Sequence, residues 1–578
     1  MPESPLHQLE RALSADDLPK VEALLAAHPG LLNAPRRCPV LLAARSVATA
    51  ERLLSLGAQL EPVSQWWAGG MGTLRTDSSV GRLLVERGAR LTVHAAAGLG
   101  LLEPLAQMLD ATPALIDAKG MDSCTPLHFA RTVETAQLLL SRGARIDARD
   151  EDHSSTPAQW LIGDAPEVAR FLLAQGASPD IFLAAALGDR TLAESLLKAD
   201  PGCVAQRIGR PPAFPPLGQG RGGTIYQWTL AFNSYPHQIA LMKGHPALFD
   251  LLYERSGLSI RLIVSCLLGR RSEAEALAAA HPGLVASLAP EEHELVARYC
   301  WETNLNVEAV RLMLDVGFPL AHPERSHGYT PLHNAAWAGS ADLVDLLLER
   351  GHPVDIEDPA YHATPLGYAL HDCLVEKRHP EGDFVHVVAA LLEAGSPWEA
   401  LDYPLGDSAI DEVFRARLHT RVDGAALLGD EAAMLRLLQE EPGPDALAKA
   451  LAGAAKGGHV ELCRRLLELG APVDAVAGRS QLTPLMYAAS ASAGPVVALL
   501  LQRGASVAVK NRNGSTVLHL AVANDPDLET VRLLLDAGAG IHVDSPNAFG
   551  HTPAKLAEKA GRQDLVELLR SFPGRDGK

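Results

Sequence analysis

Several features that mark other classes of protein are scarce or missing from this sequence. Aromatic residues make up 5% of the 578 residues, and no run of about 18 apolar residues indicates a membrane-spanning helix. The first residues lack the basic stretch and apolar segment of a secretory signal peptide. The seven cysteines are scattered and form no CxxC pair, which favours free thiols in a reducing, cytoplasmic compartment. We therefore expect no membrane insertion and no disulfide framework.

Basic residues are also fewer than acidic residues. The chain has 51 lysines and arginines against 69 aspartates and glutamates, a formal net charge of −18. A deficit of basic residues argues against duplex nucleic acid and anionic membranes as partners. Solubility is the simplest reason for the charge, and a basic partner is the more specific alternative. Arginine greatly outnumbers lysine, and together with abundant alanine and proline this is typical of a GC-rich bacterial source.

What the sequence does contain is a repeated phrase. Thr-Pro-Leu-His begins at Thr125 and Thr330, and shorter versions begin at Thr364, Thr483, Thr516 and Thr552. A leucine run and a glycine follow each phrase, and Gly504 and Gly538 lie 34 residues apart. Threonine caps a helix, proline fits its first turn, and glycine ends a second helix. The leucines share one helical face, so each unit predicts two short helices in about 33 residues.

The phrase TPLHxAA, then Gly, then a leucine run and Gly-Ala, resembles the ankyrin repeat. The resemblance implies an all-α solenoid of about 17 stacked helix pairs with short β-turn fingers, present as a monomer. In that family the histidine of the phrase bonds backbone between repeats, a role that falls here on His128, His333 and His519. The glycine that ends the second helix would be Gly351 in the repeat that begins at Thr330.

Repeat spacing divides the chain into five parts. We predict N-terminal repeats over residues 1–200, an insertion over 201–235, central repeats over 236–400 and C-terminal repeats over 401–572. The last repeat, from Thr552, is polar enough to be a capping repeat, and residues 573–578 form a tail.

The insertion departs most from the repeat pattern. Residues 201–249 contain no aspartate or glutamate, whereas the insertion carries Arg207, Arg210, Arg221, Tyr226 and Trp228. Arginine forks match carboxylate or phosphate, and tyrosine and tryptophan often anchor partners. The insertion is therefore either a contact loop or a segment that packs back on the solenoid. A GxGxxG match at Gly218 follows a run of prolines and has no acidic residue before Asp250, so we do not expect nucleotide binding there.

Other candidate contacts lie in first helices of repeats, where they face either a groove or the core. These residues are Trp337, Tyr368 and Tyr487. The stretch 371–386 lengthens one repeat by about ten residues, and we interpret it as an extended loop between helices. The histidines and cysteine of this stretch have spacings that fit no zinc module, so no metal is predicted.

No catalytic motif is recognisable, and the repeats leave no room for a separate enzyme domain. The first hypothesis is a protein-binding scaffold that uses the groove and loop tips of the array and needs no cofactor. The second is a binding site for an anion, a phosphoryl group or another small molecule at the insertion, with a hidden enzyme activity as its extreme form. The third is a purely architectural spacer.

Overall fold

The regular structure of the chain is helical, as predicted. The computed structural model describes residues 5–34, 40–60, 78–210, 213–214, 223–301, 305–523 and 527–572, which leaves Arg221 outside the described residues. Within these ranges there are α-helices, short 3-10 and π turns and one isolated bridge between Ala477 and Leu482, but no strand. None of the described helices has both the length and the apolar run that crossing a bilayer requires.

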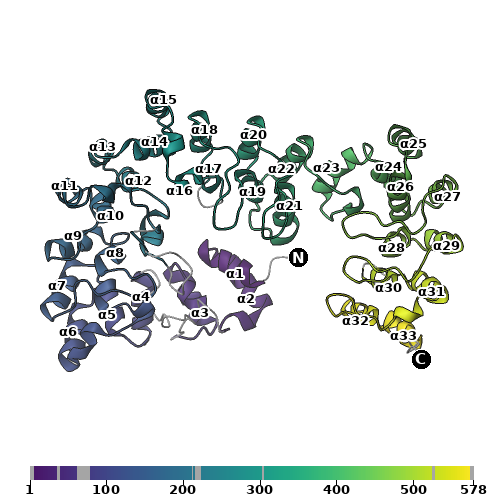
Figure 1. Cartoon of the computed structure of the whole chain (residues 1–578). Helices are drawn as coiled ribbons and strands as arrows, with labels where there is room; N and C mark the ends of the chain where they lie inside the picture. The colour runs from purple at the N-terminus through teal and green to yellow at the C-terminus, as the bar shows by residue number, and fades with distance from the viewer. Residues whose placement is uncertain are drawn as a thin grey trace. The chain divides into compact units, whose positions relative to one another are not determined.

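The helices divide between two units, each built of neighbouring helix pairs (Figure 1). Unit 1 is residues 1–288 with 315–317, and unit 2 is residues 289–314 with 318–578. Unit 1 holds α1 (Pro5–Ser14), α2 (Leu18–Ala27), α3 (Val47–Ser55), α4 (Ser78–Glu86), α5 (Val93–Gly98), α6 (Leu102–Ala111), α7 (Val133–Ser141), α8 (Pro157–Leu161), α9 (Pro166–Ala174), α10 (Ile181–Leu187), α11 (Arg190–Ala199), α12 (Pro236–Met242), α13 (Pro246–Glu254), α14 (Leu258–Leu267) and α15 (Arg271–Ala280).

Unit 2 continues the same alternation of short helices. It holds α16 (Pro290–His293), α17 (Leu295–Arg298), α18 (Val307–Asp315), α19 (Pro331–Trp337), α20 (Ala341–Glu349), α21 (Pro365–His371), α22 (Phe384–Glu393), α23 (Ser408–Leu418), α24 (Val422–Leu428), α25 (Glu431–Glu440), α26 (Pro444–Lys456), α27 (Val460–Glu468), α28 (Pro484–Ser490), α29 (Gly494–Gln502), α30 (Val517–Ala521), α31 (Leu528–Asp536), α32 (Pro553–Lys559) and α33 (Gln563–Ser571).

The repeat that begins at Thr330 shows why these residues form these helices. Thr330 lies in extended backbone just before α19, and Pro331 is the first helical residue, where a missing N–H costs nothing. Along α20, Leu343, Leu346 and Leu347 are all buried on one face. The helix then stops, and Gly351 adopts φ of 78°, the left-handed region that favours glycine.

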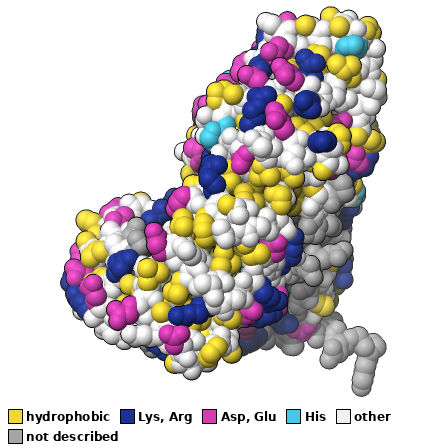
Figure 2. Space-filling view, turned by 90° about the vertical axis from the view of Figure 1, so that its left-hand side faces the viewer, with side chains coloured by type: hydrophobic (Ala, Val, Ile, Leu, Met, Phe, Trp, Pro, Cys, Tyr) yellow, Lys and Arg dark blue, Asp and Glu magenta, His cyan; other side chains and the backbone are white. Residues whose placement is uncertain are grey.

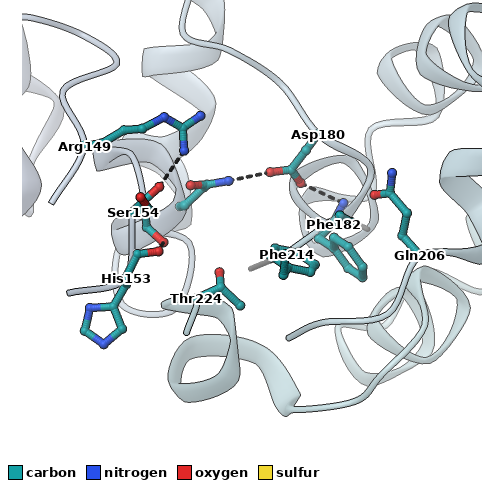
Figure 3. A pocket seen from close by; sticks show the side chains of 11 residues that line it. Arg149, His153, Ser154, Asp180, Phe182, Gln206, Phe214 and Thr224 are labelled. Carbon is teal, nitrogen blue, oxygen red and sulfur yellow. Dashed lines mark hydrogen bonds between the residues drawn. The ribbon is translucent and has the colours of Figure 1, made fainter. Parts of the chain in front are cut away.

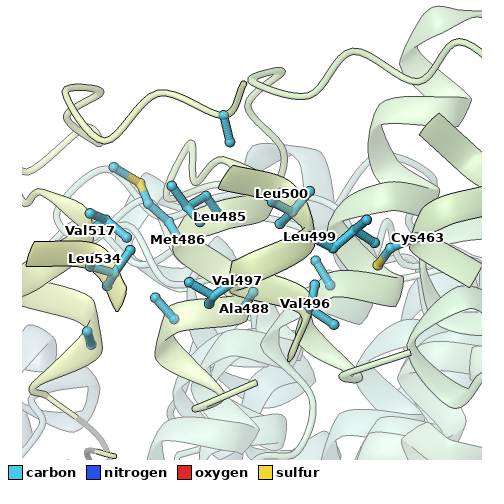
Figure 4. Close-up of a cluster of buried hydrophobic side chains, with 14 of the residues drawn as sticks. Cys463, Leu485, Met486, Ala488, Val496, Val497, Leu499, Leu500, Val517 and Leu534 are labelled. Carbon is cyan, nitrogen blue, oxygen red and sulfur yellow. The ribbon is translucent and has the colours of Figure 1, made fainter. Parts of the chain in front are cut away.

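Each helix pair buries its leucines and alanines against its neighbours. In unit 2, Leu485 and Met486 of α28 lie with Val496, Val497 and Leu500 of α29 in one buried cluster that continues into the next repeats (Figure 4). In unit 1, a separate buried cluster joins α1, α2, α3 and α4. No single repeat could bury its apolar face alone, so stability resides in the stacking of neighbours.

Two segments depart from a plain helix pair. The repeat at Thr125 has little room, and its first helix is reduced to the 3-10 turn η6 (Pro126–Phe129). In the insertion, the backbone N–H of Ile208 donates to the carbonyl oxygen of Ser234 (3.1 Å) and the N–H of Asn233 donates to that of Ile208 (3.0 Å). These two bonds close the insertion at its base. Within the insertion, Gln227–Ala231 forms the π turn η8.

Charged side chains of both signs are interspersed on the face shown in Figure 2. Among the described residues of that view, acidic and basic groups lie between apolar ones and neither sign forms a broad field.

Candidate functional site

The histidines of the repeated phrase hold successive repeats together. The Nδ1 atom of His333 accepts from the backbone N–H of Thr330 (3.3 Å), and its Nε2 atom lies 3.1 Å from the carbonyl oxygen of Ala363 in the next repeat. His128 and His519 make the same pair of contacts, His128 with Thr125 and Ser155 and His519 with Thr516 and His551. Burial lowers the pKa of His128 to about 4, so this imidazole is neutral at pH 7.

Other threonines of the phrase act as helix caps. The hydroxyl oxygens of Thr364, Thr483 and Thr552 accept from the backbone N–H three residues ahead, at 3.3 to 3.4 Å. Gly504 (φ 87°) and Gly538 (φ 97°) lie in the left-handed region after their helices, like Gly351. These residues have structural partners and do not form a reactive site.

The residues singled out in the insertion have diverse environments. Tyr226 is fully buried, and its hydroxyl donates to Oδ2 of Asp180 at 2.6 Å. Trp228, two residues later, is 73% exposed. The guanidinium of Arg207 lies 5.4 Å from the ring centroid of Tyr235, and that of Arg210 lies 5.1 Å from the ring centroid of Phe232. The two described arginines therefore stack on the insertion's own aromatic rings.

A cavity of about 420 Å³ lies where the insertion meets α8 and α10 (Figure 3). Its polar lining is largely engaged within the protein: Asp180 accepts from Nε2 of Gln159 (2.8 Å) and from the N–H of Phe182 (2.9 Å). Arg149 donates to the carbonyl oxygen of Ser154 (2.5 Å). Among the described residues, neither arginine of the insertion lines this cavity. The side chains therefore do not converge on one anion-binding position, as a site made of Arg207, Arg210 and Tyr226 would require.

A buried group of metal-ligating residue types lies beside that cavity. Ligand atoms of Asp122, Asp152 and His153 lie within 4.8 Å of one another. Nδ1 of His153 is 3.3 Å from Oδ1 of Asp150, and its Nε2 is 3.7 Å from Oδ2 of Asp152. Burial lowers the pKa of His153, but the carboxylates of Asp150, Asp152 and Asp122 together outweigh burial and the net shift is upward. The imidazolium form would balance these acids, so the group is accounted for as an ion-pair cluster.

Unit 2 contains a cavity of a different character, which we call the aromatic pocket. It has a volume of about 500 Å³ and is lined by Trp301, Tyr329, Trp337, Tyr361, Ala363, Gly367, Tyr368, His371, Glu376 and Arg378. Tyr329 and Tyr368 are buried, whereas Tyr361 is 74% exposed. The pocket is therefore an aromatic hollow with an exposed tyrosine at its rim.

The rings of the pocket contact one another in sequence. Trp301 stacks on Tyr329 with centroids 6.4 Å apart, and Tyr329 meets Tyr368 edge to face at 5.3 Å. Trp337 meets Tyr368 edge to face at 5.7 Å and stacks on His371 at 5.8 Å. Such contacts hold these five rings in place, because each of them packs against at least one of the others.

The elements that supply these rings follow from the repeat. Trp337 ends α19 and His371 ends α21, at positions 34 residues apart, so consecutive repeats bring them together. The phrase at Thr364 has Gly367 where the copies at Thr125, Thr330 and Thr516 carry histidine, and this position lines the pocket without a side chain. Tyr361 and Ala363 come from the finger before α21, and Glu376 and Arg378 from the lengthened loop after it.

The lengthened loop is held by one buried carboxylate. The helix α21 runs directly into the π turn η10 (Asp372–Glu376). The Asp372 side chain accepts from the backbone N–H groups of Arg378 (3.2 Å) and His379 (3.3 Å). Asp372 therefore fixes the backbone beside Arg378 at the pocket. His371 and His379 both contact the ring of Trp337, and His379 also pairs with Asp372, whereas His386 pairs with Asp345.

The sequence identified part of this pocket. Trp337 and Tyr368, both named as candidates, lie side by side in it, whereas Tyr487 is buried elsewhere and donates to the carbonyl oxygen of Ala477 (3.1 Å). Sequence reasoning missed Trp301, Tyr329 and Arg378. A comparison of positions one repeat apart would have found the Trp337–His371 pair, but no local signal marks the loop residues.

The comparisons agree with the architecture. The model of the ankyrin repeat matches residues 122–151 and 327–359, and the model of three ankyrin repeats matches 424–511 and 494–576. Cyclin-dependent kinase 4 inhibitor B of Rattus norvegicus is 36% identical over 124 residues, which are 22% of this chain and 92% of the inhibitor. An ankyrin repeat-containing protein of Treponema pallidum (strain Nichols) is 37% identical over 91 residues, 16% of this chain and 30% of that protein.

One wider match is to a protein whose name describes it as a palmitoyltransferase. The palmitoyltransferase ZDHHC13 of Danio rerio is 27% identical over 265 residues, 46% of this chain but 32% of that protein. The chain likewise spans only 5%, 30% and 35% of the lengths of three other curated relatives that it matches. Because the family models match along both units and the kinase inhibitor is covered over most of its length, the chain belongs to the ankyrin-repeat family.

Proposed function

We propose that this protein is a protein–protein interaction scaffold whose aromatic pocket in unit 2 receives a segment of its partner. The aromatic pocket carries the proposal, because aromatic side chains in a hollow are the usual anchors of interfaces. Tyr361 at the rim (74% exposed) and Val375 on the neighbouring turn (63% exposed) extend the apolar surface beyond the pocket.

The proposal does not include catalysis. The match to the palmitoyltransferase covers about a third of that enzyme, so its activity is not transferred to this chain. The rings, glycines and threonines of the repeats serve stacking and binding. All described cysteines are free thiols, which supports action in a reducing compartment such as the cytoplasm.

The insertion supports binding less well than the aromatic pocket does. Its described arginines stack on rings within the insertion, and Tyr226 is buried against Asp180. Trp228 remains available at its surface, so we retain this residue as a second, smaller contact.

A photo-crosslinking comparison tests the proposal. The photoreactive amino acid p-benzoylphenylalanine replaces Tyr361 in one variant, Trp228 in a second and Phe549 in a third, and all three positions are exposed aromatics (74%, 73% and 67%). We expect one defined partner to be captured from Tyr361 and not from Phe549. Capture from Trp228 alone would move the site to the insertion. Equal capture from all three positions would refute a localised site.

A further inference from the structure

The aromatic pocket already holds a cation from its own chain. The guanidinium of Arg378 lies 5.8 Å from the centroid of the Trp337 ring. The Nε atom of the same side chain donates to Oε2 of Glu376 at 3.0 Å. A planar guanidinium over an indole, bonded to a carboxylate, is the arrangement in which arginine differs most from lysine. The chain itself thus shows that a guanidinium group fits beside the ring and the carboxylate of this pocket.

The electrostatics of the pocket favour a positive group. Glu376 belongs to its lining, and Asp358 lies in the finger just before Tyr361. Burial pushes the pKa of Asp358 up, but backbone N–H donors of Tyr361, Ala363 and Ala360 outweigh burial and hold the pKa below its usual value. Burial is the largest cause that raises the pKa of Tyr368, and the neighbouring Tyr329 and the carboxylate of Asp358 raise it further.

Arg378 is held at the pocket but not locked into it. Asp372 fixes its backbone, as described above, whereas its side chain is 59% exposed. An exposed pair of this kind contributes little stability. The side chain can therefore leave Trp337 and Glu376 while the loop stays in place.

We propose that the aromatic pocket recognises an arginine side chain of the partner protein, and that Arg378 occupies the guanidinium position until the partner's arginine displaces it. This inference rests on the proposed function and specifies its ligand. The overall charge of −18 suits a partner with basic segments. Arg378 acts as an internal competitor, so it lowers the affinity of the pocket and reserves binding for segments that bring an arginine together with other contacts.

Small peptide probes test the inference on the full chain. The probe is a short capped peptide with one arginine between glycines and serines, and its counterparts carry citrulline or lysine instead. Citrulline keeps the shape of arginine without its charge. Binding is followed by fluorine NMR of fluorotryptophan-labelled protein, with the Trp337 signal assigned by a Trp337→Phe variant. We expect the arginine peptide to shift this signal and to bind about threefold or more tightly than the citrulline peptide, the scale of an exposed to partly desolvated cation–π contact.

Two substitutions separate displacement from simple binding. Arg378→Gln removes the internal competitor, so it should tighten binding of the arginine peptide, whereas Glu376→Gln should weaken it. Arg464→Gln is the matched control, because Arg464 is also exposed and its Nε donates to a glutamate of its own helix, Glu461, at 3.2 Å. The control should leave binding unchanged.

The outcomes are distinct. Equal binding of the arginine and citrulline peptides, or tighter binding of the lysine peptide, would overturn the assignment of a guanidinium site. Weaker binding of the arginine peptide to the Arg378→Gln variant would overturn displacement. Capture of a partner from Tyr361 combined with either result would leave the proposed function standing and reject only its arginine specificity.

Discussion

The neighbouring residues Tyr226 and Trp228 provide a sharp test of how the insertion is built. Both are large aromatics of the same segment, but Tyr226 is 0% exposed and Trp228 is 73% exposed. The hydroxyl of Tyr226 donates to Asp180 at 2.6 Å, across 46 residues of chain. Tyr226→Phe removes the hydroxyl that makes this bond and keeps the aromatic ring.

The expected cost follows from the partners that remain. A hydrogen bond to a charged group contributes about 1.5–3 kcal/mol. The carboxylate of Asp180 keeps three other hydrogen-bond donors, which are the side-chain amide of Gln159 and the backbone N–H groups of Phe182 and Leu183. We therefore expect the lower end, about 1.5 kcal/mol, for Tyr226→Phe. Trp228→Ala removes an exposed side chain and should change stability by less than about 0.5 kcal/mol.

Native-state hydrogen exchange is the assay, because it reports local opening. The backbone N–H groups of Ile208 and Asn233 close the insertion, and their exchange measures whether it opens. A loss of about 1.4 kcal/mol corresponds to about tenfold faster exchange at these amides. Unchanged exchange in Tyr226→Phe, or equally fast exchange in Trp228→Ala, would refute the account of the insertion as a segment anchored by one buried tyrosine.

Three further predictions concern the repeats. Burial lowers the pKa of His128 and His237 in unit 1 to about 4. The stability from these neutral imidazoles is therefore fully present above pH 6.5 and should fall as the pH drops toward 4. A thermal unfolding midpoint that stays constant over this range would contradict this prediction. Gly351→Val forces a branched side chain into φ of 78°, so hydrogen exchange should quicken first in α20 and its neighbours, and uniform quickening along unit 2 would count against the prediction. Leu500→Ala in the core of α29 should cost about 2–5 kcal/mol in urea unfolding, and a loss below 1 kcal/mol would show that this cluster does not hold the repeats together.

The fold could be predicted because its signals are local. Thr330, Pro331 and Gly351 each act on the few residues beside them, so a phrase of this kind predicts where helices begin and end. The repeat then brings successive copies together, and the ankyrin-repeat fold follows. The same signals do not say how short a first helix can become, as at Pro126, where only a 3-10 turn remains.

The candidate site was harder to predict because its contacts are not local. Trp337 and Tyr368 could be named from helix positions, but Trp301 and Tyr329 lie between helices and join the pocket through stacking. Arg378 reaches Trp337 only because Asp372 folds the lengthened loop back. In the insertion, charge and composition left a contact loop and a packed segment both open, whereas the structure packs Tyr226 against Asp180 and bonds the N–H of Ile225 to Ser155.

A partner bound at the aromatic pocket of unit 2 should leave its footprint on the full chain at that pocket. Hydrogen exchange of the chain with and without the crosslinked partner, once that partner is identified, would be compared over all described residues. We expect protection concentrated in residues 326–338 and 359–379, around the pocket and its loop. Protection confined to residues 201–235, with the pocket unchanged, would contradict it.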